Sequence, residues 1–452
     1  MAKIWSYIAL AGVVILLIVL CRVQGLPGFV KAEQSLITKL KTPTSVIPAS
    51  LFSLNLINLE YGAAWPNIPF KGWRNTYADW SILERNKGEW NFKNLDSDIA
   101  LAQQHGVEIN LILKSTPTWA SARPTETGCC YPLPWTTKGN IAEAKNLQDW
   151  KNYVRTVATR YQGRVHYYEL WNEPNVKRFY SGTIEKLILL NRAAYQVLKE
   201  VDPSIIIISS AMSPDGDHFR YFEDYLVQGG GNDADVIAYH FYVAPKSPEA
   251  MLPMIQLVQA LMAKYRLDNK PLWNTESGWK IINRDKNIND EEWAGKALSS
   301  VDASAYIARS YILSWAAGVE RLYWYAWGHR SMGLTDYDAR TPKPVAIAYA
   351  EVQKWLVGAK MTSCTSDKQN TWVCELKRDG DGCNSALGNY SAWIVWNPDR
   401  SLSFNLPQTW SVQQLRDLLG TKLSLSEANQ VEISPVPILL ERVTQLLERV
   451  TQ

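Results

Sequence analysis

Two glutamates in this 452-residue sequence stand just beyond apolar, strand-like runs, in the segments ELWNEPN and WNTESGW. Glu173 follows the run VHYYELW (165–171), and Glu276 ends the run KPLWNTE (270–276). Pro174 is expected to restrict Glu173 to extended backbone, and it cannot continue the hydrogen bonding of a strand. Two carboxyl groups held at strand ends can share a reaction, one as proton donor and the other as nucleophile or activator of water.

Such a pair suits the hydrolysis of glycosidic bonds. One acid protonates the leaving oxygen, and the second carboxylate attacks the anomeric carbon or activates water against it. One group must be protonated while the other is ionised, so their surroundings must differ. Arg74 is a candidate to hold Glu276 ionised, and aromatic neighbours and the partner charge would keep the proton on Glu173 longer. The 20 Trp and 22 Tyr fit either a cleft that stacks sugar rings or simply a large aromatic core.

Other candidate residues fall where strands are expected to end. Arg74 belongs to the second strand, and His240 and Tyr242 share one face of the sixth, because residues two apart in a strand point the same way. Glu169, four residues before Glu173, is expected to point away from the mouth and to be structural. The remaining candidates are Asn172, Trp119, Trp324 and Trp327.

Apolar strand-like runs alternate with helical patterns between residues 51 and 357. The predicted strands are 51–57, 72–76, 107–114, 165–171, 204–211, 235–242, 270–276 and 319–327. The predicted helices are 95–106, 141–163, 183–200, 217–228, 247–266, 298–317 and 343–357. Eight such units predict an α/β fold, a parallel (β/α)₈ TIM barrel. An open doubly wound sheet is the alternative, but no glycine-rich phosphate loop follows the first strand.

The texture changes after residue 358, where no long helix follows. Strand-like runs at 372–378, 391–398, 401–406 and 431–442 predict a small C-terminal β-sandwich. The expected domains are a catalytic barrel over 26–358, an accessory β-sandwich over 359–445 and a tail over 446–452 that duplicates the segment LLERVTQ.

The first 25 residues predict export from the cytoplasm. An uncharged run of 17 residues, IWSYIALAGVVILLIVL, follows Lys3 and is typical of a signal peptide or a membrane anchor. We therefore expect an extracytoplasmic protein, either secreted or anchored by this segment. The net charge of +3 indicates no basic face, so nucleic acid is not an expected partner.

The cysteines allow more than one arrangement. Cys364 and Cys374 could staple a hairpin, and pairing of Cys374 with Cys383 is equally allowed. The vicinal pair Cys129 and Cys130 is expected to brace the long loop after the third strand. The five His are scattered and no CxxC pair occurs, so we expect neither a metal nor another cofactor.

The motifs resemble those of the clan of retaining (β/α)₈ glycoside hydrolases that contains families 5, 10, 39 and 51. ELWNEPN (169–175) resembles its acid/base motif at strand four, and WNTESGW (273–279) resembles its nucleophile motif at strand seven. The segments WSILERNKGEWNFKNLD (80–96) and STPTWAS (115–121) are similar to stretches of family 39-like and family 5-like members. The resemblance covers about residues 50–357 and the trailing β-domain.

Carried over by position, the resemblance implies Glu173 as general acid/base and Glu276 as nucleophile. Asn172 would bind the sugar 2-hydroxyl, and Arg74 would neutralise the nucleophile, which Tyr242 and His240 would orient. The aromatic positions implied to contact the sugar are Trp324 or Trp327 beneath it and Trp119 beside it.

The resulting hypothesis is a retaining glycoside hydrolase that cleaves a β-linked oligo- or polysaccharide by double displacement. Two alternatives use the same residues: a transglycosylase with a sugar as acceptor, and a non-catalytic carbohydrate-binding barrel. In each case the expected partner is a carbohydrate.

Overall fold

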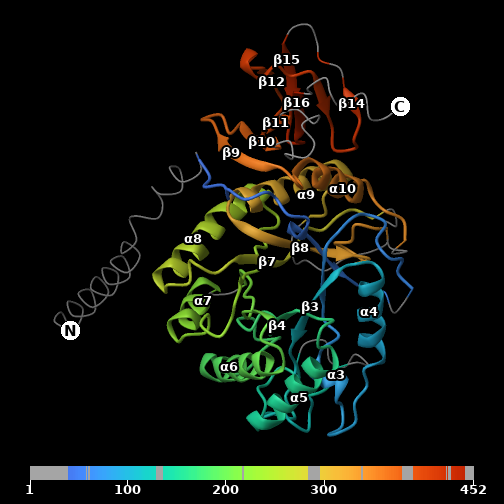
Figure 1. Ribbon diagram of the computed structural model, residues 1–452, viewed down its shortest axis with the longest axis vertical. Coiled ribbons are helices and arrows are strands. Elements are labelled where there is room, and N and C mark those ends of the chain that lie inside the picture. Colours follow the sequence, from blue (N-terminus) through green and yellow to red (C-terminus); the bar gives the residue numbers. More distant parts are fainter. Residues whose placement is uncertain are drawn as a thin grey trace, which may run out of the picture.

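The computed structural model describes residues 39–57, 59, 62–128, 136–215, 218–283, 296–336, 340–378, 390–423, 425 and 429–442. Its larger part is a parallel eight-stranded sheet wrapped by helices (Figure 1). The strands are β1 Phe52–Leu56, β2 Gly72–Asn75, β3 Glu108–Leu113, β4 Tyr167–Leu170, β5 Ile206–Ile208, β6 Ile237–Ala238, β7 Leu272–Ser277 and β8 Val319–Trp327.

The sheet closes on itself. Its strand order is β5-β4-β3-β2-β1-β8-β7-β6, and parallel bridges from Ile208 to Val236 and from Met212 to Tyr239 join the two outer strands. The predicted barrel and the predicted C-terminal β-domain are thereby confirmed as the fold class. In a closed parallel barrel all strand ends meet at one mouth, which brings residues far apart in the sequence together.

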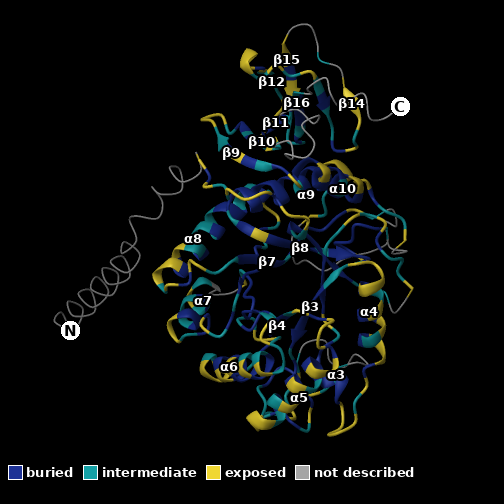
Figure 2. Ribbon diagram, in the orientation of Figure 1, coloured by how far each residue is buried: buried dark blue, intermediate teal, exposed yellow. Residues whose placement is uncertain are grey.

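Helices cover the outside of the barrel (Figure 1). They are α3 Trp80–Leu83, α4 Lys93–Gln104, α5 Leu147–Arg160, α6 Ile184–Val201, α7 His218–Val227, α8 Met251–Lys264, α9 Ser300–Ala316 and α10 Pro344–Leu356. In α5, Trp150, Tyr153, Val154 and Val157 are buried at the helical spacing while the opposite face is exposed (Figure 2).

Several elements are shorter than the sequence predicted, among them the sixth strand and the helix before β4. The strand expected over 235–242 pairs regularly only at β6, so His240 and Tyr242 lie beyond its end. The helix expected over 141–163 begins at Leu147, because the Asn146 side chain accepts a hydrogen bond from the Gln148 N–H and caps the helix there.

The end of the barrel opposite the mouth, which we call the barrel floor, is filled mainly by aromatic and aliphatic side chains. Tyr167, Trp273 and Tyr323 pack there against aliphatic residues of β5 and β6. Arg321 lies over the rings of Tyr167 and Trp273, at 4.5 and 4.3 Å from their centroids. Its guanidinium donates to Glu108 at 2.7 Å, at the edge of the floor.

The C-terminal β-domain consists of two antiparallel sheets. The larger has the order β14-β13-β16-β11-β10-β9, and the smaller pairs β12 with β15. The strands are β9 Lys360–Ser366, β10 Trp372–Arg378, β11 Tyr390–Trp396, β12 Leu402–Asn405, β13 Gln414–Arg416, β14 Lys422–Leu423, β15 Gln430–Ile433 and β16 Ile438–Arg442. The single strand predicted over 431–442 is two, since Pro435 and Pro437 interrupt the ladder between them.

Cys364 and Cys374 form a disulfide between the paired positions of β9 and β10, one of the two pairings that the sequence allowed. Cys383, the pair Cys129 and Cys130, the N-terminal segment 1–25 and the tail 446–452 lie outside the described residues. In the part of the chain that the structure describes, no helix is long and apolar enough to cross a bilayer.

The β-domain shares its packing with the barrel. Met361, Trp372 and Trp396 belong to the same buried cluster as the barrel core, and β9 lies along α9 (Figure 1). The indole N–H of Trp396 donates to Glu249, in the segment between β6 and α8, at 3.0 Å. The same carboxylate accepts from buried Arg309 of α9, so a polar contact joins the two parts inside an apolar interface.

Candidate active site

Glu173 sits at the mouth, three residues beyond the end of β4, in a left-handed backbone conformation. Its φ is +43°, and Trp171 two residues earlier has φ +68°. The expectation that Pro174 keeps Glu173 extended is therefore wrong. The Trp171 N–H donates to Leu113 of β3 and the Glu173 N–H to Ala211 beyond β5, and these bonds outweigh the local preference. Such conformations cost of order 1–3 kcal/mol each and gather at functional sites.

Glu276 is the penultimate residue of β7, and both of its carboxylate oxygens accept a hydrogen bond. Arg74 of β2 donates through Nη1 to Oε2 at 2.5 Å. The Tyr242 hydroxyl donates to Oε1 at 2.9 Å. Burial, followed by the negative charge of Glu276, raises the pKa of Tyr242 far above its ordinary value, so Tyr242 stays a donor. The two donors fix the orientation of the Glu276 carboxylate.

Arg74 is buried at the centre of a hydrogen-bonded network. Its Nε and Nη2 donate to the two oxygens of Glu169 at 3.0 and 2.6 Å, and Nη2 also donates to Asn172 Oδ1 at 2.7 Å. Burial alone would lower the pKa of Arg74, but the charges of Glu169 and Glu276 outweigh it and the pKa is raised. The guanidinium therefore remains charged under all working conditions.

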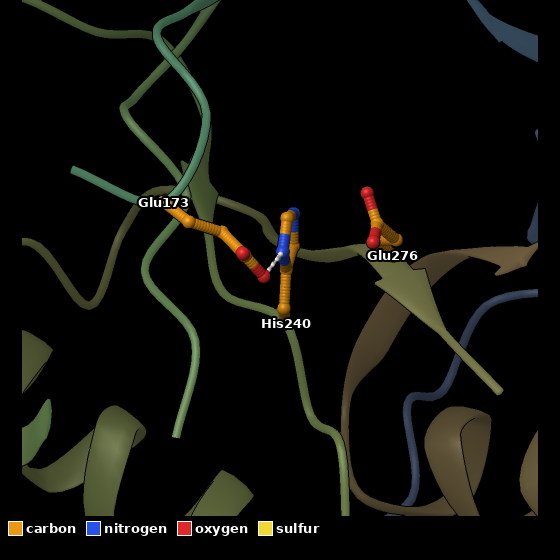
Figure 3. A group of neighbouring side chains, drawn as sticks. All are labelled: Glu173, His240 and Glu276. Carbon is orange, nitrogen blue, oxygen red and sulfur yellow. Dashed lines mark hydrogen bonds and ion pairs between the residues drawn. The ribbon is translucent and has the colours of Figure 1, made fainter. Parts of the chain in front are cut away.

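His240 contacts Glu173 and not Glu276, to which the sequence analysis had assigned it. Its Nδ1 lies 2.8 Å from Glu173 Oε1 (Figure 3). Its Nε2 lies 3.1 Å from Thr275 Oγ1. The ring is fully buried and held at both nitrogens. It therefore fixes the position of the Glu173 carboxyl group and can exchange a hydrogen bond with it in either protonation state.

The two glutamates face each other across a short gap (Figure 3). One oxygen of each, together with a nitrogen of His240, lies within 4.8 Å of the others. Carboxyl groups about 5–5.5 Å apart are typical of retaining glycosidases, and about 6.5–9.5 Å of inverting ones. The same three residues are close enough to hold a cation, but hydrogen bonds from the protein already engage both His240 nitrogens and both Glu276 oxygens.

Comparison with known proteins now identifies the barrel. Residues 70–276 match the sequence pattern of glycosyl hydrolases family 39. Most of the barrel thus carries the family 39 sequence pattern. The matched segment runs from the start of β2 to Glu276 and contains both candidate glutamates.

A β-xylosidase from Caldicellulosiruptor saccharolyticus is 30% identical over 186 residues, which are 39% of this chain and 36% of that protein. An endo-1,4-β-xylanase from Agaricus bisporus is 21% identical over 152 residues, 34% of this chain and 39% of that protein. The chain thus aligns with little more than a third of the length of either relative.

Among solved structures, a family 39 glycoside hydrolase from Bacteroides cellulosilyticus superimposes with a TM-score of 0.63 at 19% identity. The alignment covers 83% of this chain and 76% of that one. A family 39 β-xylosidase from Caulobacter crescentus gives 0.59 at 14% identity, with 89% and 98% covered. At these identities the likeness concerns the fold alone.

Two of the aromatic candidates lie away from the mouth of the barrel. Trp324 faces outward and stacks on Trp279, with ring centroids 5.6 Å apart. Trp327 is buried and donates through its indole N–H to Ala64 O at 2.8 Å. Neither forms the floor of a sugar site, as the sequence analysis had expected of one of them. Trp119 packs edge-on against Trp80 and donates to Glu84 O, outside the network around the glutamates.

Tyr325, which lies between those two tryptophans, instead points toward the mouth of the barrel. Tyr325 is half-buried, whereas both tryptophans are fully buried, and His329 packs against its ring at 5.2 Å. Burial, then the charge of Glu276, raises its pKa, so the hydroxyl stays protonated. Among the described residues this hydroxyl has no hydrogen-bond partner.

The sequence analysis missed Tyr325 and misjudged Glu169. Glu169 points into the barrel and binds Arg74, although it was expected to point away from the mouth. The alternation of inward-facing and outward-facing residues along a strand could have placed both residues. It does so only when one inward-facing residue of the same strand is already known.

Proposed function

We propose that the protein is a retaining glycoside hydrolase with β-xylosidase-like activity on β-linked xylo-oligosaccharides. The observation that supports it most directly is the facing pair Glu173 and Glu276, with oxygens within 4.8 Å. That spacing leaves room for a sugar's anomeric centre but not for an additional water between sugar and base. The choice of xylose follows from the family and from the xylosidase and xylanase named above.

In the first step, a Glu276 oxygen attacks the anomeric carbon while Glu173 gives its proton to the departing glycosidic oxygen. The bond from the anomeric carbon to the leaving group breaks, and an ester to Glu276 forms. In the second step, Glu173 takes a proton from water, the water oxygen bonds to the anomeric carbon, and Glu276 leaves as carboxylate. The configuration at that carbon is therefore retained.

The surrounding residues divide the supporting roles. Arg74 and Tyr242 hold the attacking carboxylate, and His240 holds the acid/base. The Asn172 oxygen is engaged by Arg74, which leaves its Nδ2 without a partner among the described residues and available to the sugar 2-hydroxyl. Tyr325 offers a ring edge and an unpartnered hydroxyl on the β8 side. We infer that these two donors bind the sugar from opposite walls.

The experiment is hydrolysis of aryl β-xylosides, followed by NMR to read the anomer first released. We expect β-xylose as first product, and slower turnover of aryl β-glucosides, whose extra hydroxymethyl group must be accommodated. Release of the α-anomer would contradict the double displacement. Loss of activity in Glu276→Ala, prepared in parallel, ensures that the measured hydrolysis belongs to this protein.

We further propose an extracytoplasmic location, with the segment 4–20 acting as signal peptide or membrane anchor. The Cys364–Cys374 disulfide supports this, because structural disulfides persist mainly in oxidising compartments. Sequencing the mature N-terminus after fractionating expressing cells would test it. A start beyond residue 20 in a soluble fraction would indicate cleavage, an intact segment in the membrane fraction would indicate anchoring, and cytoplasmic recovery would refute both.

A further inference from the structure

Glu169 is fully buried in β4, and its carboxylate oxygens are bound by protein groups. Arg74 donates to both oxygens, and Asn110 Nδ2 donates to Oε2 at 2.8 Å. Three hydrogen bonds from the protein thus hold this carboxyl group in place. Glu169 is too deep to touch a sugar, so any effect it has on catalysis must pass through Arg74.

The guanidinium of Arg74 bridges two carboxylates. One edge binds Glu169 through Nε and Nη2, and Nη1 binds Glu276. The guanidinium also donates to the amide oxygens of Asn172 and Asn55, and both of these side chains are neutral. One positive charge thus faces two negative charges inside the barrel, where charges interact more strongly than in water. The share of that positive charge offset by Glu169 is not available to hold Glu276.

We propose that Glu169 is a positioning residue that limits the grip of Arg74 on the nucleophile and thereby divides the barrier between the two chemical steps. The proposal rests on the retaining mechanism proposed above, with Glu276 as nucleophile. Its geometric basis is the continuous chain from Glu169 through Arg74 to Glu276.

The two steps respond to that grip in opposite directions. In the first step Glu276 changes from a carboxylate to a neutral ester, so a stronger positive charge beside it stabilises the starting state and slows attack. In the second step the ester breaks and the electron pair returns to Glu276, so the same charge helps Glu276 to leave. A change at Glu169 should therefore slow one step and spare or speed the other.

The test is Glu169→Gln, which keeps the size of the side chain and removes its charge. With 2,4-dinitrophenyl β-xyloside, kcat/KM reports the first step, and kcat reports the second when breakdown of the ester is limiting. We expect kcat/KM to fall about 10- to 100-fold while the ester-limited kcat falls less than about twofold or rises, tenfold being about 1.4 kcal/mol. Inactivation by a 2-fluoro xyloside and subsequent reactivation should show the same split.

The matched control is Glu108→Gln, which removes the acid from the Arg321–Glu108 pair at the barrel floor and should leave both constants within about twofold of wild type. Glu169→Asp keeps the charge. We expect its ratio of kcat/KM to the ester-limited kcat to lie close to that of the wild type. Equal loss of both constants in Glu169→Gln, or a control that behaves like it, would overturn the proposal.

A second variant covers the case in which Glu169→Gln does not fold. Asn110→Ala keeps every charge but removes one donor from Glu169, so Glu169 should hold Arg74 more strongly. The ratio of kcat/KM to the ester-limited kcat should then rise, opposite to its fall in Glu169→Gln and by a smaller factor. An unchanged ratio would contradict the proposal. If the wild-type protein neither hydrolyses nor is trapped by any aryl xyloside, the proposed function itself fails; an active wild type without the split refutes only the role of Glu169.

Discussion

Arg74 and Arg321 occupy the two ends of one barrel, and both are buried beside a glutamate. At the mouth, Arg74 contacts two carboxylates and two amide oxygens. At the floor, Arg321 contacts one partly exposed carboxylate, a phenol oxygen and two aromatic faces. The charge at the floor is balanced and surrounded by rings, whereas the mouth carries more negative than positive charge.

The difference separates a site for packing from a site for chemistry. At the floor, aromatic rings surround Arg321, and its ion pair is with one carboxylate, that of Glu108. The mouth holds Glu173 and Glu276 apart by hydrogen bonds from different neighbours, and it leaves two donors, Asn172 Nδ2 and the Tyr325 hydroxyl, without partners among the described residues. An inward-facing arginine alone therefore does not indicate a functional site. The second carboxylate beside Arg74, that of Glu276, does.

The largest expected difference between the ends comes from removing the nucleophile. Glu276→Ala should lower kcat by about 10⁴-fold or more, because no other group can form the covalent intermediate. The thermal unfolding midpoint should stay near that of the wild type, since Glu276 is only partly buried. Steady-state kinetics with an aryl xyloside, beside a melting curve, checks both, and retention of full turnover would move the chemistry elsewhere.

Replacing the acid/base should produce a loss that depends on the leaving group. Glu173→Gln should reduce hydrolysis of a methyl xyloside by about 10³-fold, within the range for lost proton transfer. A dinitrophenyl xyloside needs no proton on departure, so its first step should lose far less. Comparable losses on the two substrates would be inconsistent with the role of Glu173.

At the floor the expected effect is on stability instead. Trp273→Ala should lower the free energy of unfolding by about 3–4 kcal/mol, because it opens a cavity in the aromatic cluster and removes a ring from Arg321. The turnover of the remaining folded enzyme should be nearly unchanged. Chemical denaturation and active-site titration together measure the two quantities, and a large fall in turnover per active site would erase the distinction between the ends.

The smallest contrast compares two tyrosines that each lose only a hydroxyl group. Tyr242→Phe removes a donor to Glu276 and should lower kcat/KM by about 10-fold or somewhat more. Tyr323→Phe changes a tyrosine of the floor and should leave kcat/KM within about twofold of wild type. If both variants behaved alike, the donor to Glu276 would have no measurable part in catalysis.

The sequence predicted the barrel because its strands and helices differ in period and length, and it located both glutamates through their strand-end motifs. It could not assign faces within β8. Every other residue of a barrel strand points inward, but both faces are buried and both carry aromatic residues, so Trp324, Tyr325 and Trp327 look equivalent. The choice depends on register with β1 and β7, which only the fold supplies.

Glu169 and His240 were misjudged for a related reason. Their partners, Arg74 and Glu173, belong to other strand units of the barrel and lie far from them in the sequence. The left-handed conformation of Glu173 likewise depends on an acceptor beyond β5. Local sequence shows which residues reach the mouth but not which neighbour each one contacts there.

Trp396 ties the β-domain to the segment that follows β6, through the carboxylate of Glu249. A chain cut at Gly358 would leave Glu249 with one donor fewer and would bare the apolar surface of α9 and α10 to solvent. The C-terminal β-domain thus covers part of the barrel's core and is not a separable module. Grafting this catalytic unit onto another protein would require carrying residues 359–442 with it.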